Sequence, residues 1–166
     1  MEGDGGKIAQ IERLHAQYGG LLYDKCVRLL GNPTDAEEAV QETFLSAYRH
    51  WDSFTYGDSH LPWLYRIATN ACFKIMRTQR RKGFQLLEDY AQMPASQSHP
   101  LSAMHARRIL NRVVDELDER GNQILVAHWL DGMTQQEIAD MLGISRRAVV
   151  KRLTALRKRI EQLETE

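Results

Sequence analysis

The sequence predicts an all-α protein made of two small helical domains joined by a flexible linker. Apolar residues recur every three or four positions over most of the chain, as in amphipathic helices, and no segment alternates like a half-buried strand. This period is lost over residues 83–104, where Pro94 and Pro100 stand among small polar residues. We therefore expect a first domain at 1–82, the linker at 83–104 and a second domain at 105–166.

The composition is typical of a soluble globular protein. Of the 166 residues, 43% are hydrophobic and 27% are charged, and no segment approaches the roughly 20 apolar residues of a membrane helix. The two cysteines, Cys26 and Cys72, lie apart in apolar surroundings, as is usual in a reduced protein. We expect a cytoplasmic protein without membrane insertion.

Two helices joined by a tight turn are predicted at the start of the first domain. The first covers residues 8–30 and ends at Gly31-Asn32-Pro33, and Thr34 or Asp35 is expected to cap the second, at 35–52. The outward face of the second helix is rich in acids and comprises Asp35, Glu38, Gln41, Glu42, Ser46 and Arg49. Composition alone is equally consistent with a solvated face and with a docking face for a protein.

A third helix is predicted from Leu61, with Pro62 in its first turn, where the missing N–H costs no hydrogen bond. The face that belongs in a core carries Leu64, Ala68, Cys72 and Ile75. The opposite face carries Arg66, Asn70, Lys74 and Arg77, at steps of three or four residues. Cations at this spacing can follow one phosphate strand while the amide of Asn70 reaches a base edge.

The second domain is predicted to contain a helix-turn-helix. Its helices are expected at about 105–117, 119–130, 135–142 and 146–162. The run from Thr134 to Glu137 has the pattern of a capping box, and Gly143 supplies the left-handed residue that ends the helix. Ser145 then caps the next helix, which in such a motif enters the DNA major groove.

Positive charge is concentrated on the last predicted helix, although the whole chain is balanced at 22 basic and 22 acidic side chains. Residues 143–160 hold seven Lys or Arg and no acid. The outward positions are Arg146, Arg147, Val150, Lys151, Thr154 and Lys158. Further along, Arg157, Lys158 and Arg159 are expected to meet phosphates or solvent. A solvated basic face is the alternative, but charge and motif together favour DNA binding.

The two halves of the chain resemble one bacterial family. The stretches DAEEAVQETFLSAYRHWDSF (35–54) and LPWLYRIATNACFKIMRTQRR (61–81) resemble region 2 of the extracytoplasmic-function (ECF) sigma factors. Residues 115–160, which begin DELDERGNQILVAHW, resemble region 4 of the same family. Order, linker and length agree, so the resemblance covers about residues 8–162.

The resemblance implies an alternative sigma factor that binds core RNA polymerase and directs promoter-specific initiation of transcription. The third helix and the loop before it, at about 55–60, would recognise the promoter −10 element and hold bases flipped from the opened duplex. The helix-turn-helix would read the −35 element. The implied partners are promoter DNA, the polymerase β flap, an anti-sigma factor, and the β′ clamp helices, which would contact Asp35, Glu38, Gln41 and Glu42.

Aromatic residues surround the predicted −10 loop. Stacking of an unpaired base on an aromatic side chain contributes about 1–3 kcal/mol. Phe54 and Tyr56 lie on the loop and are the candidates for this contact, although packing is an equally good interpretation of either. Trp51, Trp63 and Tyr65 have core spacing and are interpreted as packing residues.

The chain departs from the family pattern at three places that bear on DNA sequence. Leu61-Pro62 stands where a small or basic residue and Thr are common, Val150 replaces a frequent Lys or Arg, and Arg146-Arg147 replaces an apolar residue and Gly. The promoter sequences of relatives therefore cannot be transferred to this chain.

No residue pattern predicts catalysis, a metal or a cofactor. The six histidines are scattered, and no Gly-rich phosphate loop is present. The leading alternative is a free-standing helix-turn-helix transcription regulator, which would bind duplex operator as a dimer. Two further alternatives are a helical nucleic-acid enzyme, for which Glu37, Glu38 and Glu42 form the only tight carboxylate group, and a sigma-like antagonist that binds proteins.

Overall fold

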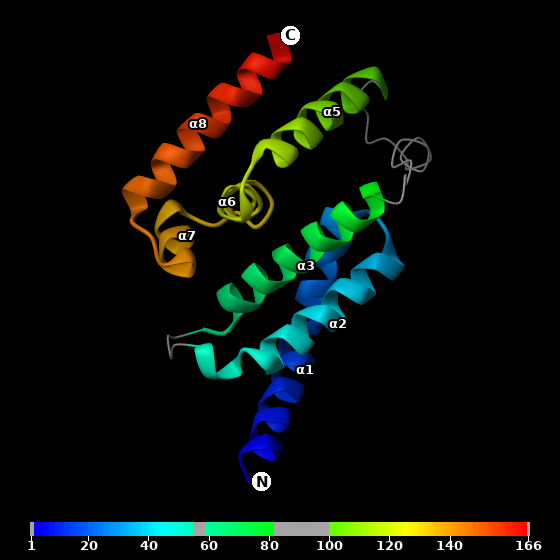
Figure 1. The fold of residues 1–166 in the computed structure, drawn as a ribbon, viewed down its shortest axis with the longest axis vertical. Coiled ribbons are helices and arrows are strands. Elements are labelled where there is room, and N and C mark those ends of the chain that lie inside the picture. The colour runs from blue at the N-terminus through cyan, green and yellow to red at the C-terminus, as the bar shows by residue number, and fades with distance from the viewer. Residues whose placement is uncertain (1, 55–58, 82–99, 166) are drawn as a thin grey trace. The chain divides into compact units, whose positions relative to one another are not determined.

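The structure, a computed structural model, describes residues 2–54, 59–81 and 100–165. The chain divides into two compact units, residues 1–83 and 84–166, and each is described by itself (Figure 1). Every regular element in the described ranges is a helix. The predicted all-α class is thus confirmed.

The first unit is a bundle of three helices, α1 (Glu2–Leu30), α2 (Pro33–Arg49) and α3 (Leu61–Arg81). A short 3-10 turn, Trp51–Ser53, follows α2. Each helix packs against the other two. The three predicted helices are confirmed, although α1 begins several residues before the expected start at residue 8.

The core of this unit combines leucines of α1 and α3 with alanines of α2 and α3. Leu22 and Leu64 are fully buried, and so are Ala36 and Ala68. Alanine at the contact between two helices lets their axes approach closely, which explains why short side chains suffice to fill the centre. The free cysteines Cys26 and Cys72 belong to the same core, and the remaining buried members are Leu14, Leu30, Ala39, Val40, Phe44, Ala47 and Ala71.

The start of α2 differs from the prediction, which placed the cap at Thr34 or Asp35. Asn32 is the cap, and its Oδ1 accepts hydrogen bonds from the N–H groups of Thr34 (2.8 Å) and Asp35 (3.1 Å). Pro33 is the first helical residue. The physical reason is that proline lacks an N–H and has a helical φ, so the first position of a helix suits it. The cap is therefore Asn32, two or three residues before the predicted position.

The second unit has four helices, α5 (Pro100–Glu116), α6 (Glu119–Trp129), α7 (Gln135–Leu142) and α8 (Arg146–Thr165). The last three agree with prediction to within three residues at either end. Of the predicted linker, residues 83–99 lie outside the described residues, and 100–104, predicted to be linker, belong instead to α5. As at α2, a proline begins the helix.

The long helix α8 organises the second unit, because both core clusters depend on it. Its N-terminal half packs Val149 and Leu153 against α6 and α7, where Ile124 and Ile138 are fully buried. Its C-terminal half packs against α5 in a second cluster, composed of Ile109, Val113, Leu156 and Leu163. Packing against α6 and α7 therefore fixes the orientation of the first half of α8 within the unit.

Two properties of the described residues bear on the kind of protein. None of their helices is both long and apolar enough to cross a bilayer. Among the same residues there is no group of three or more His, Cys, Asp or Glu arranged to hold a metal ion.

Candidate nucleic-acid interface

The turn between α7 and α8 has the geometry that the sequence predicts. Thr134 Oγ1 accepts from the Glu137 N–H at 3.2 Å, and Glu137 Oε2 accepts from the Thr134 N–H at 2.7 Å. Hydrogen bonds to the Glu137 carboxylate, first from the Thr134 backbone N–H and then from the Thr134 side chain, lower the pKa of Glu137. Gly143 is left-handed, with φ 62°, and the Ile144 N–H returns to the Ala139 carbonyl at 3.0 Å. The capping box and the glycine stop are both confirmed.

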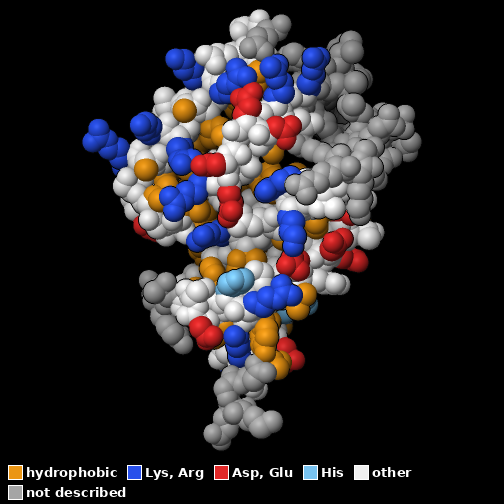
Figure 2. All heavy atoms as spheres, in the orientation of Figure 1, with side chains coloured by type: hydrophobic (Ala, Val, Ile, Leu, Met, Phe, Trp, Pro, Cys, Tyr) orange, Lys and Arg blue, Asp and Glu red, His pale blue; other side chains and the backbone are white. Residues whose placement is uncertain are grey.

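The first helical turn of α8 is fixed by Ser145, whose Oγ accepts from the Ala148 N–H at 3.1 Å. On the inner side, Val149 and Leu153 are buried. On the outer side all six predicted positions are exposed, and these are Arg146, Arg147, Val150, Lys151, Thr154 and Lys158. Figure 2 shows Lys and Arg side chains gathered on the exposed surface along α8. The predicted orientation of the helix is confirmed.

Two of the seven cations on this helix form ion pairs with carboxylates of the same unit. Arg152 Nη1 lies 2.9 Å from Asp118 Oδ1. Arg159 donates two hydrogen bonds to the Glu116 carboxylate, from Nε to Oε2 at 2.6 Å and from Nη2 to Oε1 at 2.7 Å. The expectation that Arg159 meets phosphates or solvent is therefore wrong. The sequence does carry a signal for this contact. Arg152 and Arg159 are seven residues apart, so they lie on the same side of the helix, beside its buried stripe.

These ion pairs act on the two carboxyl groups. The hydrogen bond from Arg159 is the main reason why the pKa of Glu116 is lowered. The pKa of Asp118 is lowered first by the Gly121 N–H, which it accepts at 2.7 Å as the cap of α6, and then by Arg152. Both pairs stand at a partly exposed surface, so each adds only modestly to the stability of the unit while it joins α8 to α5 or to the start of α6.

The predicted DNA face of α3 is also on the outside of its unit. Arg66, Lys74 and Arg77 are exposed and Asn70 is half-buried. On the other side, Leu64, Ala68 and Cys72 are fully buried and Ile75 packs against the same core. The helix is therefore amphipathic as predicted, with a cationic strip along its outer side.

A cluster of four rings lies between the turn after α2 and the start of α3. Phe54 and His60 are parallel, with centroids 4.3 Å apart, and Trp51 lies 5.7 Å from His60 at 11°. Trp63 tilts against Phe54 at 4.9 Å. Trp51, Trp63 and Tyr65 pack on the core as predicted. Tyr56 lies outside the described residues.

Sequence reasoning missed His60. A histidine in a loop carries no stacking signal by itself, and its partner Phe54 is six residues away, so only the three-dimensional arrangement brings the rings together.

The predicted docking residues of α2 differ in how exposed they are. Glu38 and Gln41 are exposed. Asp35 accepts a hydrogen bond from Gln79 Nε2 of α3 at 2.6 Å, and Glu42 is half-buried. Leu45, which sequence reasoning did not single out, is 51% exposed on the same face, and its spacing from Gln41 could have revealed it.

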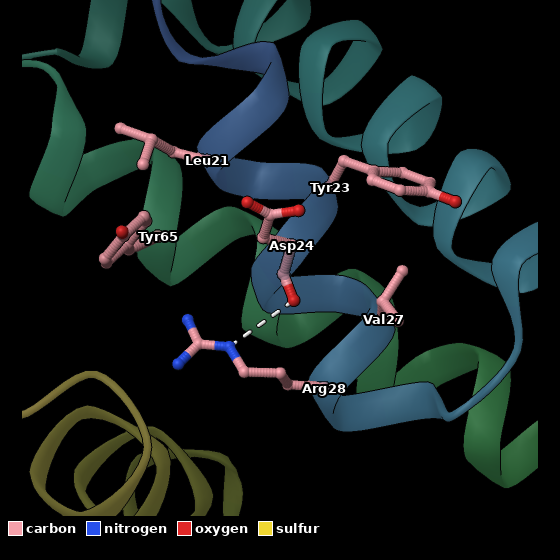
Figure 3. A pocket seen from close by; sticks show the side chains of 6 residues that line it. All are labelled: Leu21, Tyr23, Asp24, Val27, Arg28 and Tyr65. Carbon is pink, nitrogen blue, oxygen red and sulfur yellow. Dashed lines mark hydrogen bonds between the residues drawn. The ribbon is translucent and has the colours of Figure 1, made fainter.

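A pocket of about 530 Å³ lies elsewhere on the first unit (Figure 3). Five of its lining residues come from α1, and Tyr65 comes from α3. Arg28 Nε, in this pocket, donates to the Asp24 carbonyl oxygen at 3.4 Å. None of the lining residues is among those predicted to contact DNA or polymerase.

Comparison with known proteins identifies both units. Residues 14–82 match the family described as Sigma-70 region 2, and residues 113–162 match Sigma-70, region 4. The first match covers the three-helix bundle from residue 14 on, and the second covers the helix-turn-helix. The fold and the two matches thus place the chain in the sigma-70 class of proteins.

Whole-chain relatives narrow the class. The chain is 30% identical over 161 residues to the ECF RNA polymerase sigma factor SigW of Bacillus subtilis, with 88% of this chain and 86% of that protein covered. It is 30% identical over 155 residues to SigE of Mycolicibacterium smegmatis, covering 91% of this chain and 60% of that protein. The chain belongs to the ECF RNA polymerase sigma factors, which are transcription initiation factors.

Two solved structures share the fold. CnrH in complex with the cytosolic domain of CnrY has a TM-score of 0.54 and 23% identity, covering 98% of this chain and 92% of that one. RpoE in complex with the anti-sigma factor NepR, from Bartonella quintana, has a TM-score of 0.53 and 20% identity, covering 94% and 97%.

Proposed function

We propose that this chain directs core RNA polymerase to its promoters through two DNA-contacting surfaces, the outer face of α8 and the outer face of α3. The single observation that supports this best is the arrangement of α8. Its inner stripe is locked in a capped helix-turn-helix, and its outer face is cationic and exposed. Such a helix can enter a major groove without rearrangement of its unit.

For the −35 element, we assign base contacts to the N-terminal half of α8. Residues there approach base edges most closely in helix-turn-helix proteins. The group comprises Ser145, Arg146, Arg147, Val150, Lys151 and Thr154. Lys158, one turn beyond, would contact a phosphate. Arg152 and Arg159 are excluded from the group because they hold carboxylates of their own unit.

For the −10 element, we assign phosphate contacts to Arg66, Lys74 and Arg77 and a base contact to Asn70. The four side chains lie on one side of α3, away from the core. Tyr56 remains a candidate for stacking on an unpaired base. Phe54 contacts three other rings of its unit, those of Trp51, His60 and Trp63, which favours a structural role for it.

The proposed protein partners follow from the surfaces and from the relatives. Asp35, Glu38, Gln41 and Glu42 would dock on the β′ clamp helices of core polymerase, and the second unit would bind the β flap. Solved relatives are bound to CnrY and to the anti-sigma factor NepR, so an anti-sigma factor is proposed as a regulator of this chain too. The site of action would be the cytoplasm, where polymerase meets the chromosome.

Run-off transcription with core polymerase over a genomic promoter library tests the proposal. The chain should give transcripts from a small set of promoters that share −35 and −10 sequences, and core polymerase alone should not. A gel shift without polymerase tests the alternative. Tight dimeric binding to duplex DNA, with no transcripts in the run-off assay, would support a free-standing helix-turn-helix regulator instead.

A further inference from the structure

We propose that His60 is a positioning residue for capture of the −10 strand. Its ring, at the start of α3, stacks on Phe54, which follows the 3-10 turn after α2. The inference rests on the proposed function of the first unit and goes beyond it by naming what holds the DNA-contacting helix in place. The Phe54 and His60 rings are stacked at 4.3 Å with planes 19° apart. Trp51 extends the stack on His60 at 5.7 Å and 11°.

The backbone of His60 belongs to the first turn of α3. Its carbonyl oxygen accepts the Leu64 N–H at 2.9 Å, and the Leu61 N–H donates to Ser59 Oγ at 3.3 Å. Because the His60 ring is joined to this capping turn through its Cβ, the contacts that hold the ring also restrain the turn. The stack on Phe54 therefore sets the position at which α3 begins relative to the end of α2.

Two tryptophans give the stack a fixed base. Trp51 and Trp63 both pack against the core of the unit, and they meet edge to face at 6.2 Å. Phe54 lies between Trp63, at 4.9 Å, and His60, at 4.3 Å. The order of contacts runs from the core through Trp63 and Phe54 to His60, so each ring limits the freedom of the next.

The consequence for DNA concerns the residues that follow on α3. Arg66 and Asn70 lie within the next three turns, and their positions follow the direction of the helix axis. A binding site works when supporting residues hold its contact groups to within about 0.5 Å. Loss of the His60 ring should loosen the first turn and impair strand capture, while the distant α2 docking face keeps its shape.

Three substitutions separate this role from simple stability. His60→Phe keeps a flat ring, and His60→Leu keeps apolar volume without one. His15→Leu is the matched control, since His15 contacts Phe44 at 4.7 Å in another ring pair of the same unit, formed by α1 and α2. Each variant is assembled into holoenzyme. The probes are a single-stranded non-template oligonucleotide over the −10 region of a promoter that the wild type transcribes, and a duplex fragment carrying only the −35 element.

His60→Leu should bind the single strand about two- to ten-fold more weakly, the range expected for one aromatic contact. Its affinity for core polymerase and for the −35 duplex should be unchanged. His60→Phe should stay close to the wild type, and His15→Leu should bind the single strand normally.

Three results would overturn the inference. These are normal single-strand binding by His60→Leu, an equal loss in His15→Leu, and a loss in His60→Phe as large as in His60→Leu, since the last would make imidazole chemistry the cause. Failure of the proposed function looks different, because then the wild-type holoenzyme itself would neither transcribe nor bind the single strand.

Discussion

The carboxylate of Glu42, on α2, lies 4.0 Å from Lys74 Nζ, on α3, and 3.6 Å from Arg49. Glu42 belongs to the proposed polymerase face and Lys74 to the proposed −10 face. A second contact, between Asp35 and Gln79, joins the same two helices. The two proposed surfaces therefore share an edge, and the acids nearest that edge have contacts within the unit while Glu38 points outward.

Reversing Glu38 should weaken binding to core polymerase, because an exposed acid of the proposed docking face becomes a cation. Glu38→Lys should change the free energy of unfolding by about 0.5 kcal/mol or less, as usual for a surface position. Glu37→Lys is the matched control, with the same charge change one residue away on a different side of α2. Competition for labelled core polymerase gives the affinities. If the two variants lose affinity equally, or neither does, the docking face lies elsewhere.

Two glycines should respond to alanine with opposite signs. Gly143→Ala should lower the free energy of unfolding of the second unit by about 1–2 kcal/mol, because its left-handed backbone disfavours a Cβ. Gly20→Ala should stabilise α1 by about 0.5–1 kcal/mol, since the new methyl group meets no atom within 4 Å in a regular helix. Denaturant unfolding measures both changes. For Gly143→Ala the signal is the fluorescence of Trp129, the only tryptophan in the sequence of the second unit. A stabilising Gly143→Ala would contradict the assigned turn.

Acid should destabilise the second unit through Glu116 and Asp118. Arg159 lowers the pKa of Glu116, and the Gly121 N–H with Arg152 lowers the pKa of Asp118. In each case the folded pKa lies below the unfolded one. The resulting stability is complete above the unfolded pKa of about 4 and is lost as the pH falls through the folded pKa. Thermal unfolding between pH 7 and 3 should show this loss.

A pair of variants tests the cause of that pH dependence. Arg159→Gln should flatten the acid dependence, because the hydrogen bonds that favour the Glu116 carboxylate are removed. Arg157→Gln is the control, since Arg157 is exposed on the same stretch of α8. A steep acid transition that survives in Arg159→Gln would assign the effect to other carboxyl groups.

The sequence predicted those parts of the fold whose signals are local. The capping box at Thr134, the glycine stop at Gly143 and the outward face of α8 all depend on neighbours within one or two turns. The errors at helix ends share a cause. The sequence pattern indicates breaks at Pro33 and Pro100, yet each of these prolines begins a helix, because the missing N–H is harmless there.

Contacts between distant residues were beyond the sequence patterns. Arg159 and Glu116 are 43 positions apart, and helical period places Arg159 at the edge of the buried stripe without saying which side chain it meets. Asp35 and Gln79 are 44 positions apart and illustrate the same limit on the proposed docking face. Period fixes which way a side chain points, and only packing fixes its partner.

Lys158 and Arg159 should differ in their effect on DNA binding, although they are adjacent cations. Lys158→Ala should weaken holoenzyme binding almost equally for all −35 sequences and reduce the salt slope by about one unit, as expected for a phosphate contact. Arg159→Ala should lower the stability of the second unit and leave the salt slope nearly unchanged, because its charge is paired with Glu116. Binding titrations at several salt concentrations measure both. Equal slopes for the two variants would mean that Arg159 leaves Glu116 for DNA.

Arg147 should determine base preference at the −35 element. It is exposed on the first turn of α8, which approaches base edges most closely in a helix-turn-helix. An Arg hydrogen-bonded to guanine discriminates against the wrong base by about 1–3 kcal/mol, whereas Val150 beside it can offer only an apolar contact, for example to a thymine methyl group.

Arg147→Ala should therefore relax the preference at particular −35 positions, and Lys158→Ala should leave all preferences as they are. Holoenzyme binding to a randomised −35 library measures the two patterns directly. If Arg147→Ala keeps every preference while Lys158→Ala changes them, then the C-terminal half of α8 lies in the groove, and the helix enters DNA in the opposite sense to the one proposed.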